Sequence, residues 1–151
     1  RHCSTREAFW LGYELLCAVG LSDAERVMES YPGQLSGGML QRVMVAIAVS
    51  LRPVLLIADE PTTALDVTIQ AQIISLLLRL KQERGLSIIF ISHDIDLVAQ
   101  ISDRIAVMRH GKIVETGSAA QIMTTPRHEY TKVLISAVPK FGEHYSDTVK
   151  A

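Results

Sequence analysis

The heptapeptide Val-Leu-Leu-Ile-Ala-Asp-Glu at residues 54–60 decides the fold class. Its first five residues form a short apolar run, which is typical of a central strand in a parallel sheet. Asp66 is a good N-cap for a helix predicted over residues 67–84, and Gly85 is suited to ending that helix. A second apolar strand is predicted over residues 87–91. A strand, a helix and a strand of these lengths predict an α/β crossover unit with parallel strands.

Further elements are predicted on both sides of this unit. The apolar spacing predicts helices over residues 7–19, 23–30 and 39–51, then a helix over 95–102, a hairpin of strands 104–108 and 112–115, and helices over 118–123 and 129–137. The helix over 39–51 carries apolar residues on nearly its whole circumference. We therefore expect that helix to be buried nearly all round.

The composition indicates one globular domain. The chain has 151 residues, of which 48% are hydrophobic and 21% charged, and its formal net charge is -1. That charge balance gives no basic surface for nucleic acid, so we expect no nucleic-acid partner. We also expect no signal peptide and no membrane span. The two cysteines, Cys3 and Cys17, predict reduced thiols rather than a disulfide or a metal framework.

Acidic and histidine side chains follow the two predicted strands. Asp59 and Glu60 end the first strand, and His93 comes just past the second. Ligands of open parallel sheets lie outside the carboxyl ends of the strands, so these three residues should meet at one edge. One carboxylate could hold a magnesium ion while the other orients or deprotonates an attacking water. The alternative is that the acids only cap the following turn, residues 61–63.

Ser36, Gly37 and Gly38 stand at the start of a predicted helix. Glycines let a backbone approach a ligand closely, and a helix start offers free N–H groups to a phosphate. The alternative is an ordinary helix N-cap by Ser36, with the glycines serving a turn. No loop of the form Gly-x-x-x-x-Gly-Lys-Ser/Thr occurs in the chain. The sequence therefore predicts only half of a nucleotide site.

In order and spacing these motifs resemble the C-terminal part of an ATP-binding-cassette (ABC) ATPase, the motor subunit of ABC transporters. Residues 35–42, Leu-Ser-Gly-Gly-Met-Leu-Gln-Arg, match the signature motif of that family, and residues 54–60 match its Walker B strand with the catalytic glutamate. Residues 63–66, Thr-Ala-Leu-Asp, match the D-loop, where the family usually begins with serine. Residues 91–94, Ile-Ser-His-Asp, match the segment of the switch histidine.

The resemblance implies the fold and its divisions. It implies the C-terminal portion of a P-loop NTPase-type parallel sheet with flanking helices, plus part of the helical subdomain. We expect residues 1–34 in a partial helical subdomain, residues 35–125 in the nucleotide-binding core and residues 126–151 in a C-terminal tail. The P-loop half would lie upstream of the fragment. The sheet would then lack strands and expose edges and an apolar face.

The resemblance also implies roles at an ATP site shared by two subunits. Ser36, Gly37 and Gly38 would contact the γ-phosphate of ATP held by the opposite subunit, and Asp66 would cross the dimer interface. Gln41 is counted with them as a nucleotide-site residue.

The remaining roles concern the metal ion and the reaction itself. Asp59 would bind Mg2+ through water, and Glu60 would polarise the attacking water. His93 would clasp the γ-phosphate. Gln41 and Arg42 would brace the signature helix.

The tail narrows the expected branch of the family. Residues 126–131, Pro-Arg-His-Glu-Tyr-Thr, resemble the tail of peptide and nickel importer ATPases, which usually have proline where Glu129 stands. Residues 31–34 also look like that branch, and residues 38–42 lean slightly toward its nickel members. His110 and His128 are expected to be a turn residue and a packing or capping residue.

The expected function is therefore an ATP-hydrolysing subunit of an importer for oligopeptides, dipeptides or nickel. Expected partners are a second ABC ATPase subunit, membrane permease subunits and a periplasmic or lipid-anchored solute-binding protein. The expected location is peripheral, on the cytoplasmic face of the inner membrane. The fragment alone should be inactive. The alternatives are a non-transport ABC ATPase, acting in DNA repair or on ribosomes, and a non-enzymatic partner module.

Overall fold

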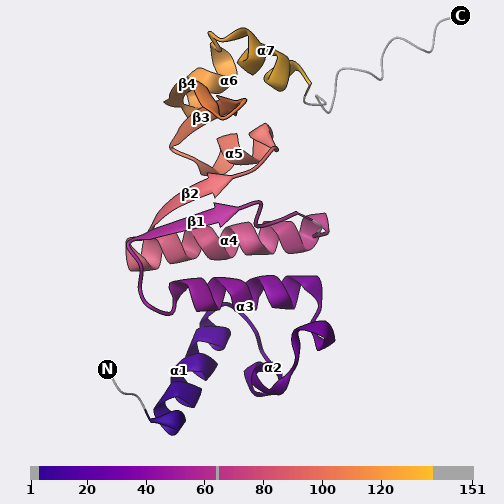
Figure 1. Ribbon diagram of the computed structural model, residues 1–151, viewed down its shortest axis with the longest axis vertical. Coiled ribbons are helices and arrows are strands. Elements are labelled where there is room, and N and C mark those ends of the chain that lie inside the picture. Colours follow the sequence, from indigo (N-terminus) through magenta and orange to yellow (C-terminus); the bar gives the residue numbers. More distant parts are fainter. Residues whose placement is uncertain (1–3, 64, 138–151) are drawn as a thin grey trace, which may run out of the picture. The chain divides into compact units, whose positions relative to one another are not determined.

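The computed structural model describes residues 4–63 and 65–137, which belong to two compact units divided after Ile91. The first unit, residues 1–91, contains α1 (Thr5–Ala18), α2 (Ala24–Glu29), a 3-10 turn η1 (Pro32–Gln34), α3 (Gly37–Val49), β1 (Leu55–Asp59), α4 (Val67–Arg84) and β2 (Ser87–Ile91). The second unit, residues 92–151, contains α5 (Ile95–Ile101), β3 (Arg104–Arg109), β4 (Lys112–Ser118), α6 (Ala119–Thr124) and α7 (Glu129–Ser136). Figure 1 shows these elements along the chain.

The predicted α/β unit is confirmed. β1 and β2 pair in parallel, from Leu55 opposite Ser87 to Asp59 opposite Ile91, and α4 connects them. Asp66 caps α4, as predicted, and Gly85 ends that helix at φ 62°. Within the described ranges the sheet has these two strands only.

The sheet is buried on one face rather than both, which corrects the expectation of a central strand. Leu56, Ala58, Ile88 and Phe90 pack into the core together with α4. The alternate side chains stay in solvent, since Ile57 is 62% exposed. Other exposed apolar residues on that face are Leu55, Ile89 and Ile91. The prediction of an exposed apolar sheet face is thereby confirmed.

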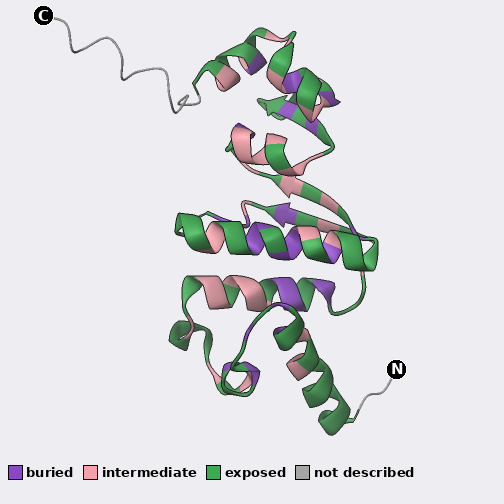
Figure 2. Ribbon diagram, turned by 180° about the vertical axis from the view of Figure 1, so that it is seen from behind, coloured by how far each residue is buried: buried purple, intermediate pink, exposed green. Residues whose placement is uncertain are grey.

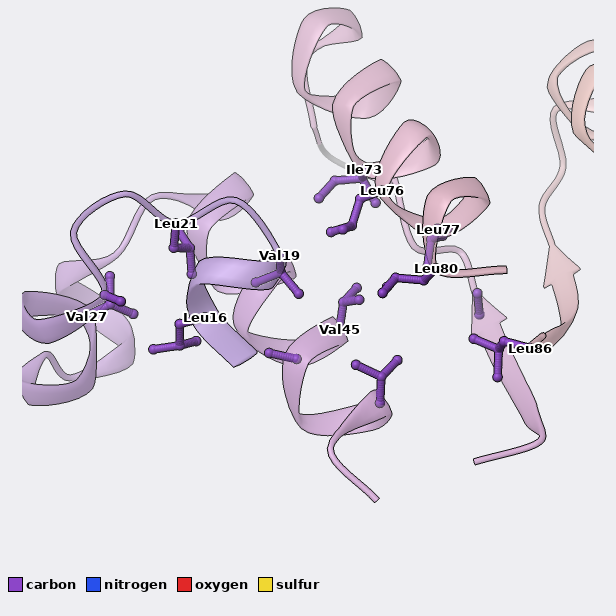
Figure 3. Close-up of a cluster of buried hydrophobic side chains, with 14 residues drawn as sticks. Leu16, Val19, Leu21, Val27, Val45, Ile73, Leu76, Leu77, Leu80 and Leu86 are labelled. Carbon is purple, nitrogen blue, oxygen red and sulfur yellow. The ribbon is translucent and has the colours of Figure 1, made fainter. Parts of the chain in front are cut away.

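The core of the first unit is built around α4, which lies between α3 and the strands in Figure 1. Ile73 and Leu80 on α4 are essentially fully buried. Figure 3 shows both residues gathered with side chains from α1, α2, α3 and the loops after α1 and α4, including Leu16, Val19, Val45 and Leu86. Each such residue contributes about 1.5–3 kcal/mol through burial. The packing of several elements around α4 therefore forms the core of this unit.

The expectation that α3 is buried nearly all round is wrong. Only Val45, Ala46 and Val49 of this helix are buried. Met44 is 58% exposed and Ile47 is 64% exposed. Figure 2 shows the mixture of buried and exposed residues along the helix. An apolar pattern on every side of a helix does not say which sides meet a neighbour: α3 packs against α1 and α4 and leaves Met44 and Ile47 in solvent.

The second unit is built on an antiparallel hairpin. β3 pairs with β4, and the His110-Gly111 turn between them has φ of 48° and 74°. Two consecutive residues with positive φ are the requirement of a type I′ hairpin turn, so His110 is the turn residue that was predicted. A small core of Ile95, Ile105 and Ile122 joins the hairpin to its helices. None of the helices in residues 4–63 and 65–137 is long and apolar enough to cross a membrane.

Candidate functional site

The signature segment forms the start of α3. The Ser36 hydroxyl caps the helix by accepting a hydrogen bond from the Met39 N–H at 3.3 Å. The first N–H groups of a helix have no partner inside it. Those of Gly37 and Gly38 find no acceptor in the part of the chain that the structure describes. Both N–H groups and the positive end of the helix dipole are thus available to a phosphate, which fits the ATP contacts predicted here.

The D-loop forms the start of α4. The Asp66 carboxylate accepts a hydrogen bond from the Ile69 N–H at 2.9 Å. The two helices lie side by side and both begin at the same end (Figure 1). A Cβ on Gly37 would lie 3.5 Å from Leu65, and a Cβ on Gly38 would lie 2.7 Å from Ile69. The structure therefore brings the signature glycines and the D-loop together.

Asp59 and Glu60 stand at the carboxyl end of β1. Asp59 is the last residue of the strand and is exposed. Glu60 follows in the left-handed region at φ 46°, and its N–H donates to the Ile91 carbonyl at 2.9 Å. In this conformation Glu60 leaves the alternation of the strand that ends with Asp59. The two acids can therefore take different roles.

The Glu60 carboxylate also contacts the turn that follows it. It accepts a hydrogen bond from the Thr63 hydroxyl at 2.7 Å, as the turn-capping alternative requires. The left-handed conformation of Glu60 is unfavourable, because it costs a residue with a side chain roughly 1–2 kcal/mol. Strained residues occur at active sites, but Arg52 and His110 have the same left-handed φ, so the strain does not by itself mark Glu60 as functional. Capping and chemistry are compatible, since Thr63 also orients the carboxylate.

His93 is exposed and lies two residues beyond β2, in the second unit. That His93 comes close to Glu60 stays a prediction. The structure shows only that β1 and β2 are parallel and that Ile91, two residues before His93, stands opposite Asp59.

Arg42 braces α3 against two other helices. Its guanidinium donates to the Val19 carbonyl at 2.6 Å and to the Gln72 side-chain oxygen at 2.9 Å. The first contact satisfies a carbonyl at the C-terminus of α1, a helix with no basic residue in its last turn. Gly20 has φ 82°, and a Cβ there would lie 2.9 Å from the guanidinium. Gln41 is half-buried, and its nucleotide contact stays a prediction.

A magnesium site would use Asp59 together with groups from outside this segment. The described residues contain no cluster of three or more histidine, cysteine and acidic side chains. Mg2+ is commonly held by one or two carboxylates plus substrate phosphates and water. Asp59, an exposed carboxylate at the end of β1, could supply one such ligand.

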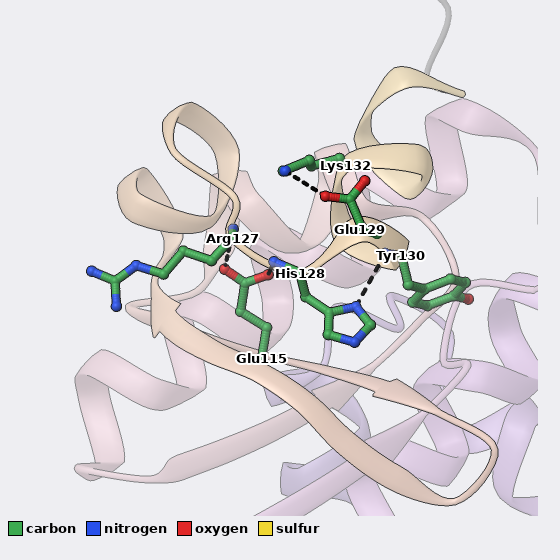
Figure 4. A network of polar contacts seen from close by, with 6 residues as sticks. All are labelled: Glu115, Arg127, His128, Glu129, Tyr130 and Lys132. Carbon is green, nitrogen blue, oxygen red and sulfur yellow. Dashed lines mark hydrogen bonds and ion pairs between the residues drawn. The ribbon is translucent and has the colours of Figure 1, made fainter.

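Glu115 anchors the segment before α7 in the second unit (Figure 4). Its carboxylate accepts hydrogen bonds from the N–H groups of Arg127 at 2.8 Å and His128 at 3.0 Å. The neighbouring Thr131 hydroxyl and these N–H groups hold the pKa of Glu115 below its usual range. Thr131 is fully buried, and its hydroxyl lies beside the carboxylate without completing hydrogen-bond geometry.

The start of α7 gives roles to two residues of the predicted tail, His128 and Glu129. The His128 ring caps the helix by accepting from the Tyr130 N–H at 3.1 Å, which confirms His128 as a capping residue. Glu129 is the first residue of the helix, a position where proline is also favoured because its N–H has no helical partner. The acidic side chain suits the first turn equally well.

The sequence did not predict the contacts that three residues make at these sites: Ile69, Gln72 and Glu115. Ile69 and Gln72 looked like ordinary positions of an amphipathic helix. Glu115 looked like a polar residue of a hairpin strand. Each acts on a backbone or a side chain distant in sequence, and no local motif marks such a contact.

Residues 10–63 match the family described as ABC transporter, and residues 114–151 match the family described as oligopeptide/dipeptide transporter, C-terminal region. The chain belongs to the ABC transporter family. The match to the first family spans the signature and Walker B segments, and the match to the second spans Glu115 and α7.

Two relatives illustrate the similarity. The peptidoglycan transport ATP-binding protein YejF of Agrobacterium fabrum is 53% identical over 137 residues, which cover 91% of this chain and 25% of that protein. The glutathione import ATP-binding protein GsiA of Escherichia coli K12 is 51% identical over 142 residues, which cover 94% of this chain and 23% of that protein. This ABC chain thus spans about a quarter of the length of the relatives it matches.

Proposed function

We propose that this chain supplies the signature, Walker B, D-loop and switch-histidine segments of an ATP-hydrolysing importer subunit. The observation that carries the proposal is the common position of the starts of α3 and α4, where Gly38 meets Ile69 beside Asp66. Two capped helix starts in contact, with free N–H groups on one and a carboxylate on the other, suit a nucleotide bound between two subunits. The sheet then belongs to a P-loop NTPase-type core.

The residues divide the work of ATP hydrolysis. The N–H groups of Gly37 and Gly38 bind the γ-phosphate of ATP held by the P-loop of the opposite subunit, with Ser36 fixing the turn. Asp59 would hold a magnesium ion, which would supply positive charge to the phosphates. Glu60 accepts the proton of the attacking water, and His93 binds the transferring phosphoryl group. Gln41 supports the nucleotide site from α3, and Asp66 reaches the opposite subunit.

The residue range 114–151 supports an importer of peptide-like cargo, because it matches the C-terminal region of oligopeptide and dipeptide transporters. The relatives are named for glutathione import and for peptidoglycan transport. Cargo with peptide bonds is therefore favoured over nickel. The proposed partners are a second ATPase subunit, permease subunits and a solute-binding protein, at the cytoplasmic face of the membrane. The same match favours transport over DNA repair or a ribosomal role.

The experiment compares substitutions of Ser36 in an ATPase assembly that contains this chain and supplies the P-loop. Ser36→Arg removes the cap and places bulk and charge at the phosphate position, while Ser36→Ala removes only the cap. Ser118→Ala is the matched control, because Ser118 caps α6 by accepting from the Gln121 N–H at 3.2 Å. We expect Ser36→Arg to reduce ATPase activity by about 100-fold or more, as loss of an electrostatic phosphate contact does.

Ser36→Ala and Ser118→Ala should cost stability by about 1 kcal/mol each, with much smaller losses of activity. If Ser36→Arg had the same ATPase activity as the wild type, the signature would not contact the nucleotide, and the proposal would be contradicted.

A further inference from the structure

Ile69 is held at two points that both belong to the proposed nucleotide site. Its backbone N–H donates to the Asp66 carboxylate at 2.9 Å. Its Cγ2 methyl lies where a Cβ on Gly38 would come within 2.7 Å. One residue therefore contacts the D-loop through its backbone and the signature through its side chain.

The two signature glycines differ in how tightly they are packed. A Cβ on Gly37 would meet Leu65 at 3.5 Å, an ordinary van der Waals distance. A Cβ on Gly38 would meet the Ile69 methyl at a distance that real side chains do not adopt. Gly38 is thus required by the packing of α3 on α4, independently of any approach to a phosphate.

The methyl that faces Gly38 cannot easily move away. Cγ2 is bonded to Cβ, and β-branched side chains in a helix have one strongly preferred χ1 rotamer. The Ile69 backbone lies in the first turn of α4, which the Asp66 cap fixes. The contact therefore behaves as a rigid seat for the first turn of α3.

We propose that Ile69 is a positioning residue of the nucleotide site: its Cγ2 methyl seats Gly38 and so aligns the phosphate-binding N–H groups of α3 with Asp66 of the D-loop. This inference rests on the proposed function and adds a residue to it. Ile69 touches neither phosphate nor water in this account and acts through Gly38 and Asp66. A change in the seat would displace the signature relative to the D-loop without unfolding the unit.

The test uses the different branching of leucine and valine, in an ATPase assembly that contains this chain and supplies the P-loop. Valine retains a methyl at the Cγ2 position, and leucine has none there. Gly38→Ala should clash with isoleucine and with valine at position 69 but not with leucine. We therefore measure kcat and KM for ATP in the wild type, Gly38→Ala, Ile69→Leu, Ile69→Val and both double variants.

Gly38→Ala should lower kcat/KM by about tenfold or more, since overpacking of this kind shifts backbone. Adding Ile69→Leu should restore most of that loss, and adding Ile69→Val should restore none. Ile69→Leu alone should lower kcat/KM by less than about tenfold, because the seat is lost without a clash. Equal failure of both double variants, or full activity of Gly38→Ala alone, would overturn the inference.

Chemical unfolding of the same six proteins, followed by fluorescence of Trp10, the single tryptophan, separates this inference from the proposed function. Absence of ATP turnover in the wild type would contradict the proposed function. The clash would still be decided by unfolding, where Gly38→Ala should be destabilised with isoleucine or valine at position 69 and rescued with leucine. Equal stability throughout would overturn the seat. Rescue of stability without rescue of kcat/KM would reduce Ile69 to a structural residue and overturn its positioning role.

Discussion

The Glu60 N–H donates a hydrogen bond to the Ile91 carbonyl at 2.9 Å, continuing the pairing of the two strands one residue past the end of β1. This bond holds Glu60 in the left-handed conformation, where its carboxylate turns toward Thr63. Ile91 is also the residue from which the chain continues to His93. The chemistry proposed for Glu60 thus depends on how the ends of two strands are joined.

Arg42 should be needed for the stability of the first unit. Arg42→Ala removes the hydrogen bonds to Val19 and Gln72 and leaves the Val19 carbonyl without its guanidinium partner. Hydrogen bonds to charged groups contribute about 1.5–3 kcal/mol, so we expect a loss of about that size in the free energy of unfolding. Urea unfolding followed by Trp10 fluorescence measures it, since Trp10 lies on α1.

Gln72→Ala and the double variant complete a mutant cycle for Arg42. Residues in contact show coupling of about 0.5–3 kcal/mol, whereas independent residues give additive losses. Additive losses would mean that Arg42 braces α1 alone and that α3 and α4 are joined by apolar packing only.

Gly85 should be required for its backbone conformation alone. A Cβ at Gly85 would meet nothing within 4 Å, yet the residue has φ 62°. Gly85→Ala should therefore destabilise the protein by about 1–2 kcal/mol through left-handed strain. Gly33→Ala is the matched control, because a Cβ there also meets nothing within 4 Å and the residue lacks a positive φ. Thermal unfolding should show a fall for Gly85→Ala and none for Gly33→Ala; equal effects would refute the strain argument.

Glu115 should make the second unit sensitive to acid. The Thr131 hydroxyl and the N–H groups of Arg127 and His128 favour the charged carboxylate, so its pKa is lower in the folded protein than the ordinary value of 4.5. A lowered pKa in the folded state contributes stability that is complete above the unfolded value and is lost as pH falls through the folded one. The loss should therefore appear below about pH 4.5.

Glu115→Gln tests this acid sensitivity, with Glu83→Gln, an exposed residue of α4, as the control for removal of one carboxylate. Amide resonances of residues 126–136 followed by NMR between pH 7 and pH 3 report the second unit directly. Glu115→Gln should flatten the pH dependence of these signals, and a dependence identical to that of the wild type would assign the acid sensitivity elsewhere.

Local signals made much of this fold predictable. The Asp66 cap and the Gly85 C-terminus fixed the bounds of α4, because each supplies a backbone requirement that few residues meet. The β2 run was recognised to the residue, and the turn at His110-Gly111 followed from hairpin chemistry. In these places one or two neighbouring residues determine the conformation.

The parts that could not be predicted depend on contacts between distant segments. Which residues of α3 are buried was missed, because Met44 and Val45 are equally apolar and only the positions of α1 and α4 distinguish them. At the site, the sequence predicted the residues at the starts of α3 and α4 but not the Gly38–Ile69 seat that joins them. The left-handed Glu60 was likewise hidden, since glutamate carries no preference for that conformation.

The most direct measurement of the central claim is single-turnover hydrolysis of ATP by Glu60→Gln in the ATPase assembly, with ATP binding measured on the same protein. Glutamine keeps the size of the side chain but cannot accept the proton of the attacking water. The account predicts unimpaired ATP binding and a hydrolysis rate lower by about 100-fold to 10,000-fold, the usual contribution of a general base. Hydrolysis at the wild-type rate would contradict the assignment of Glu60 and, with it, the proposed site.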